Sequence, residues 1–119
     1  MTLLARLIAK EEGFGLPNAL PTRDHNPGDL RHSPHSEHPG DPNAIGVIDN
    51  DQDGWADLER QLKLYAARGL TLADMVEEYA PPNENQTQAY LNFICTRLGL
   101  PPTATVAQAL EVTDDARPA

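Results

Sequence analysis

Two adjacent glutamates, Glu11 and Glu12, stand where a helical pattern of apolar residues stops and a long loop begins. A carboxylic acid that is still protonated near neutral pH can protonate the leaving oxygen of a glycosidic bond. Partial burial in an apolar cleft and the negative end of a helix dipole both favour the protonated form. The position therefore suits a general acid, although most glutamates are solvated surface residues.

The helical wheel separates the two glutamates. Glu11 falls near the centre of the apolar face formed by the preceding Leu and Ile residues, and Glu12 lies at the margin of that face. A side chain at the margin of the apolar face can line a cleft and stay accessible to substrate. A carboxylate at the centre of that face has to be buried and paired. The wheel therefore favours Glu12, but geometry near a helix end is too loose for it to decide between the two glutamates.

Four short motifs follow one another along the chain. They read IAKEEGF at 8–14, NPGDLR at 26–31, DGWADL at 53–58 and YAPPNEN at 79–85. In order and spacing, this set resembles small lysozyme-like domains of phages and prophages, within the superfamily of phage lysozymes and lytic transglycosylases. Some of these domains are labelled phage structural proteins. The resemblance covers about Leu3 to Leu110.

The resemblance implies a function and a set of site residues. The implied activity is cleavage of the glycan strands of peptidoglycan, of the muramidase or the lytic transglycosylase type, with Glu12 as general acid. The NPGDL segment would form the cleft wall opposite Glu12, and Tyr79 would bond the sugar. The residues implied to bind the substrate are Asn26, Asp29, Arg31, Tyr79 and Asn85. Tyr79 and Asn85 also suit purely structural roles, as a packed helix end and as a helix cap.

Several alternatives stay open within this interpretation. Asp24 and Asp29 are candidates for a second carboxylate, whose distance from the acid would decide the stereochemistry. A transglycosylase would instead use the substrate's own groups as nucleophile. The other function to consider is a non-catalytic phage or prophage structural or glycan-binding module with the same fold, because fold does not establish function.

Two sequence patterns have the residue types and spacing of metal-binding sites, and each also has an interpretation without a metal. The residues from Asp49 to Gly54, with Asp57, match DxDxDGxxD, the oxygen-rich spacing of a calcium loop, but Arg60 stands where that loop needs a bidentate Glu. The alternative is an acidic first turn that complements a helix dipole. His25, His32, His35 and His38 could gather zinc if their loop curled suitably, but a solvated polar loop is the preferred interpretation. We expect no metal and no other cofactor.

The positions of apolar and helix-ending residues predict a mainly α, lysozyme-like fold with about five helices. The expected helices lie near 2–12, 52–68, 72–79 and 90–98, with a short last one after Thr105. Six prolines between Pro17 and Pro42 predict an irregular lobe between the first two helices, with a small strand at Ala44–Ile48. We expect a single domain over 1–112 and a frayed tail over 113–119.

The charge and the hydropathy of the chain limit the classes of partner that it can bind. A formal net charge of −9 argues against nucleic-acid binding, because such proteins neutralise phosphates with Lys and Arg.

No apolar run is long enough for membrane insertion. The first ten residues lack the basic leader and cleavage site of a signal peptide. We therefore expect synthesis in the cytoplasm and either phage association or delivery to the cell wall by another system. Peptidoglycan strands are the expected partner, with other phage particle components as the alternative.

Overall fold

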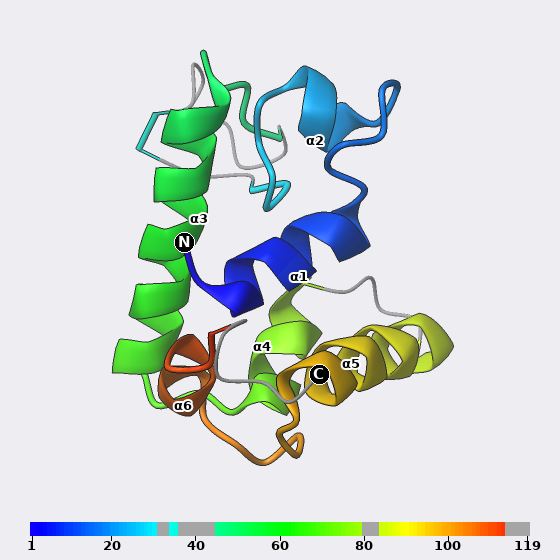
Figure 1. The fold of residues 1–119 in the computed structure, drawn as a ribbon, viewed down its shortest axis with the longest axis vertical. Coiled ribbons are helices and arrows are strands. Elements are labelled where there is room, and N and C mark those ends of the chain that lie inside the picture. Colours follow the sequence, from blue (N-terminus) through cyan, green and yellow to red (C-terminus); the bar gives the residue numbers. More distant parts are fainter. Residues whose placement is uncertain (31–33, 36–44, 80–83, 114–119) are drawn as a thin grey trace. The chain divides into compact units, whose positions relative to one another are not determined.

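The chain folds into α-helices (Figure 1). The structure is a computed structural model that describes residues 1–30, 34–35, 45–79 and 84–113. Within these ranges it holds no β-strand and six helices: α1 (Leu3–Glu12), α2 (Leu20–Arg23), α3 (Asp51–Ala67), α4 (Leu72–Tyr79), α5 (Glu84–Leu98) and α6 (Val106–Leu110). The prediction of a mainly α chain is confirmed, with one helix more than expected.

The additional helix is α2, which lies inside the proline-rich segment. It begins after Ala19 and carries Pro21 in its first turn. A proline there lacks only an N–H group that no helical carbonyl would have accepted, so it does not oppose the helix. The prediction took the prolines of this segment as signs of irregular chain throughout. At Pro21 that interpretation was wrong.

The end of α1 follows from Gly13. Its φ of 93° lies in the left-handed region, where a residue without a Cβ is least strained. The N–H of Phe14 donates to the carbonyl of Ala9 at 2.9 Å, and the N–H of Gly13 donates to the carbonyl of Lys10 at 3.1 Å. These bonds satisfy carbonyls at the end of the helix. They also fix the chain direction directly after Glu12.

Two compact units divide the chain. The first comprises Met1 and residues 5–61, and the second comprises residues 2–4 and 62–119. The first unit buries apolar side chains from α1, from the segment before α3 and from α3 itself: Ala5, Leu7, Ile8, Ala9, Leu30, Ile48 and Leu58. The prediction of one domain over 1–112 concerns how the two units combine, and it stays a prediction.

The predicted strand at Ala44–Ile48 is an extended segment in its described part, residues 45–48. It makes two backbone hydrogen bonds of 2.9 Å, from the N–H of Gly46 to the carbonyl of Leu30 and from the N–H of Ile48 to the carbonyl of Asp24. Two such bonds hold the segment against the 24–30 loop without forming the ladder of a sheet. Ala44 lies outside the described residues.

The second unit is built around α4, which contacts both α5 and α6 (Figure 1). Thr71 and Asp74 cap α4 reciprocally, with two bonds of 3.1 Å, and Thr105 and Gln108 form the capping box of α6. Both caps confirm the predicted helix starts. The N–H of Val106 also donates to the carbonyl of Leu70, at 2.8 Å, which ties the two capped starts together. No described helix has the length and apolar character needed to cross a bilayer.

Candidate functional site

Glu12 is the last residue of α1, and it is partly buried, whereas Glu11 is exposed. The helical wheel placed Glu11 near the centre of the apolar face. The wheel assumes a regular helix that continues on both sides, and this condition fails in the last turn before Gly13. Of the two glutamates, only Glu12 combines partial burial with access to solvent. This combination is what a general acid for a bound substrate needs.

An aromatic pair follows Glu12 along the first unit. Phe14 packs edge-on against Trp55 of α3, with ring centroids 5.3 Å apart and planes at 74°. Both residues are partly exposed. Edge-to-face packing of this kind stabilises an aromatic pair beyond the apolar area that it buries. The contact therefore fixes the chain just beyond Glu12 on the first turns of α3.

Asn26 is the polar centre of the NPGDLR motif, and it is fully buried. Its Nδ2 donates to the carbonyls of Leu30 at 2.8 Å and Gly46 at 2.9 Å, and its Oδ1 accepts from the N–H of Leu30 at 3.0 Å. The amide thereby closes the 26–30 turn and holds it to the extended segment. Asn26 was predicted to bind substrate. With no exposed surface, it has a positioning role in this geometry.

The same turn lies against α3 at Gly54. A Cβ at this position would stand 2.0 Å from the carbonyl oxygen of His25 and 2.8 Å from Cδ of Pro27. Both distances are far shorter than ordinary contacts, and the first is to backbone that has little room to move. Glycine at 54 is therefore a condition for the close packing of the 25–27 chain on α3.

We expect Gly54→Ala to destabilise the first unit by about 1–3 kcal/mol, the range typical of overpacking. In an open helical position the same exchange stabilises by about 1 kcal/mol, so the sign of the effect tests the close approach. Urea unfolding followed by the fluorescence of Trp55, the one tryptophan, measures it. Gln52→Ala, at an exposed site of the same helix, is the control and should change stability little. A Gly54→Ala variant as stable as the wild type would contradict the packing.

The candidates for a second carboxylate both lie in the first unit. Asp29 adopts a φ of 51°, which Asp tolerates better than most residues, and its N–H donates to the carbonyl of Asn26 at 2.9 Å. Asp24 directly follows α2 and accepts the N–H of Ile48 through its carbonyl. Both are partly buried. Arg31, the third residue predicted from this motif, lies outside the described residues.

Tyr79 and Asn85 belong to the second unit. Tyr79 ends α4 and packs edge-on against Tyr65, with ring centroids 6.2 Å apart. Asn85 is the second residue of α5, which begins at Glu84. The alternative that Asn85 caps this helix does not hold, because a cap precedes the first helical residue. A sugar-binding role for either residue stays a prediction.

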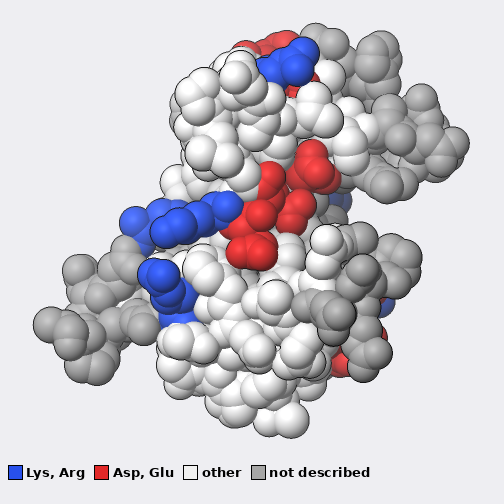
Figure 2. Space-filling view, turned by 90° about the vertical axis from the view of Figure 1, so that its right-hand side faces the viewer, with Lys and Arg blue, Asp and Glu red and all other residues white. Residues whose placement is uncertain are grey.

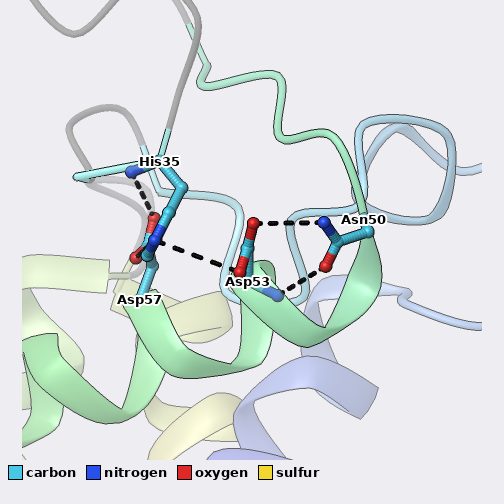
Figure 3. A network of polar contacts seen from close by, with 4 residues as sticks. All are labelled: His35, Asn50, Asp53 and Asp57. Carbon is cyan, nitrogen blue, oxygen red and sulfur yellow. Dashed lines mark hydrogen bonds and ion pairs between the residues drawn. The ribbon is translucent and has the colours of Figure 1, made fainter.

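The calcium-like pattern forms the beginning of α3 (Figure 3). Asn50 precedes the helix and accepts the N–H of Asp53 through Oδ1 at 2.9 Å, while its Nδ2 donates to Oδ2 of Asp53 at 3.1 Å. Asn50 and Asp53 therefore act as a helix cap, and Asp51 and Asp53 are acidic residues of the first turn. This geometry favours the acidic-turn interpretation of the pattern.

The two histidines that the structure describes both pair with aspartates of α3. Nδ1 of His25 lies 2.8 Å from Oδ1 of Asp51, and both side chains are about half exposed. His35 contacts Asp57 through Nδ1, and its Nε2 lies 4.0 Å from Oδ1 of Asp53 (Figure 3). His32 and His38 lie outside the described residues. In the described part, no three His, Cys, Asp or Glu side chains form a group able to hold a metal.

Of the two histidines in this arrangement, His35 has a pKa that its surroundings shift clearly. The hydrogen bond and the negative charge of Asp57 raise the pKa of His35 above its ordinary value of 6.5. Desolvation opposes this effect, and Asp53 adds a smaller contribution in the same direction as Asp57. Sequence reasoning missed the pair, because it treated the histidines and the aspartates as two separate patterns.

The surface reflects the acidic composition. On the face that Figure 2 draws, Asp and Glu side chains lie together with Lys and Arg side chains beside them, and the formal net charge of the whole chain is −9. Such a surface attracts cationic groups and repels phosphate backbones. It places no comparable restriction on a neutral sugar chain.

Comparisons with known proteins returned no match to a protein-family model, to a curated protein or to a solved structure. The resemblance to lysozyme-like domains therefore depends on the four motifs and their order. The structure adds the positions of their residues, with Glu12 at the end of α1 and Asn26 at the centre of a buried turn.

Proposed function

We propose that this chain cleaves the β-1,4 glycan strands of peptidoglycan, with Glu12 as the general acid in a lysozyme-like fold. The observation that carries the proposal is the contrast between partly buried Glu12 and exposed Glu11 at the end of α1. Partial burial places the Glu12 carboxyl group against the protein, and partial exposure leaves it accessible to a glycosidic oxygen. The order of the four motifs along the chain supports the same assignment.

In this mechanism, Glu12 transfers its proton to the bridging oxygen as the bond from that oxygen to the anomeric carbon breaks. Such a transfer is worth roughly 10²- to 10⁴-fold in rate. The positive charge that develops on the sugar ring is then quenched in one of two ways. Either water attacks and gives a proton to Asp24 or Asp29, or a hydroxyl group of the same sugar attacks, closes an anhydro ring and gives its proton to the Glu12 carboxylate. The first is hydrolysis and the second is transglycosylation.

Local contacts hold the chain that follows Glu12 and, separately, the turn that carries Asp29. Gly13 and the two backbone bonds that close α1 set the chain direction, and Phe14 is fixed against Trp55. The buried amide of Asn26 holds the 26–30 turn, to which Asp29 belongs, in one shape. A site of this kind holds catalytic groups in place before substrate arrives, which lowers the barrier to reaction.

The test is release of soluble muropeptides from purified peptidoglycan by the wild-type chain. We expect release, and the mass of the new ends then distinguishes reducing sugars, the products of hydrolysis, from anhydro sugars, the products of transglycosylation. A folded chain that releases nothing from several wall types would contradict the proposal. The conclusion would then be a non-catalytic phage or prophage structural or glycan-binding module, which a pull-down with insoluble peptidoglycan would test directly.

A further inference from the structure

The starting point is a buried charge on α3. Asp57 is only 2% exposed, although Asp is rarely buried without a partner. Both of its carboxylate oxygens are engaged by one residue. The backbone N–H of His35 donates to Oδ2 at 3.0 Å, and Nδ1 of the His35 ring bonds to Oδ1 (Figure 3). A buried carboxylate that loses its partner is strongly destabilising, so these contacts hold His35 firmly on the helix.

The His35 ring itself is not buried. Its side chain is 47% exposed, and Nε2, the nitrogen not bonded to Asp57, lies near Asp53, whose side chain is 39% exposed. The ring can therefore exchange protons with solvent while Nδ1 stays on a buried partner. A titrating group with one accessible nitrogen and one fixed nitrogen can change its charge without leaving its position.

We propose that His35 and Asp57 form a pH-dependent latch, which fastens the chain at residues 34–35 to α3 most tightly when His35 carries a proton. In that state an imidazolium ion pairs with a buried carboxylate, and Asp53 adds a second negative charge. When the proton leaves, Nδ1–H still donates to Asp57, but the attraction between opposite charges is gone. Among the described residues, the charged groups recorded against His35 are Asp53 and Asp57, both of α3.

The direction of the pH effect follows from thermodynamic linkage. The pKa of His35 is higher in the latched state than its ordinary value of 6.5, because of the hydrogen bond and the charge of Asp57. The stabilisation that protonation supplies is therefore fully present below the pKa of the unlatched chain. It is lost as the pH rises through the higher pKa of the latched state. The latch loosens on the alkaline side.

Two-dimensional NMR of the histidine ring protons, on the full chain, tests the latch. We expect His35 to titrate above 6.5, and we expect Asp57→Asn, which keeps the shape and removes the charge, to move its pKa down. His25→Gln is the matched control. It removes a histidine paired with the exposed carboxylate of Asp51, and it should leave the His35 titration unchanged. A wild-type His35 that titrates at or below 6.5 would overturn the proposal.

Hydrogen exchange of backbone amides supplies a second readout that needs no variant. The His35 amide donates to Asp57, the ion-pair partner of the titrating His35 ring, and the Leu30 amide donates to Asn26, which does not titrate. After correction for intrinsic rates, we expect protection of the His35 amide to fall several-fold relative to Leu30 as the pH rises through the His35 pKa. The limiting fold-change equals the ratio of the acid dissociation constants of His35 in the unlatched and latched states. A ratio that stays constant with pH contradicts the latch, even if Asp57→Asn does not fold.

Discussion

Glu12→Gln is expected to lower the rate of muropeptide release by about 10²- to 10⁴-fold, the usual contribution of a general acid. The amide has nearly the shape of the carboxyl group but has no acidic proton to give to the glycosidic oxygen. Because Glu12 is partly exposed at the end of α1, the exchange should leave the fold intact. Rates are measured on purified peptidoglycan at equal protein concentration, with thermal unfolding of each variant as the check on folding.

Glu11→Gln is the matched control for this experiment. It makes the same chemical change one residue earlier, at an exposed position. We expect activity close to that of the wild type. Equal losses in the two variants would point to an effect of net charge on binding, and a loss in Glu11→Gln alone would move the acid to Glu11. A Glu12→Gln variant as active as wild type would remove Glu12 from the chemistry.

Local signals in the sequence predicted the end of α1 and the starts of α4 and α6, because the contacts that end or begin a helix lie within a few residues. The helix expected at 90–98 instead begins at Glu84. Gly13 ends α1, and the Thr71–Asp74 and Thr105–Gln108 pairs cap α4 and α6 through bonds to residues three positions away. Such contacts depend little on the rest of the fold. They are readable from the chain itself.

Contacts between residues far apart in the chain could not be predicted from the sequence in the same way. Asn26 meets Gly46 across 20 residues, and His35 meets Asp57 across 22 residues. A single sequence does not show which distant groups will meet. On a helical wheel Asp57 lies well away from the apolar stripe of Trp55, Leu58 and Leu62, so the sequence carries no sign that this carboxylate is buried. Its burial, and its need for a partner such as His35, become visible only in the fold.

For the candidate site, too, the sequence indicated which residues to consider but not how the fold surrounds them. Glu12 was selected by position and by resemblance, and its partial burial could not be derived from the helical wheel, because the last turn of α1 departs from a continuous helix. Asn26 was selected as a sugar-binding residue by the same resemblance. Polarity alone does not tell whether an amide faces a ligand or a buried backbone, because both need hydrogen-bond partners.

Asn26→Ala should lower the free energy of unfolding of the first unit by about 3–5 kcal/mol. The exchange removes three hydrogen bonds and leaves buried backbone groups of Leu30 and Gly46 without their partner, at about 1–3 kcal/mol for each unsatisfied group. The vacated volume adds to this loss. Urea unfolding monitored by Trp55 fluorescence reports on this unit, because Trp55 belongs to it. Asn92→Ala, at an exposed site on α5, should change stability by less than about 0.5 kcal/mol.

Asn26→Asp separates the structural role of this side chain from a sugar-binding role. Asp retains the acceptor for the N–H of Leu30 but loses the donor to two carbonyls, and it places a negative charge where Asn26 is fully buried. If Asn26 holds the turn, the aspartate variant is destabilised at least as much as the alanine variant, and activity falls together with stability. If Asn26 instead binds sugar, both variants keep their stability and lose affinity for peptidoglycan. Unfolding curves and binding measured on the same preparations decide between these two roles.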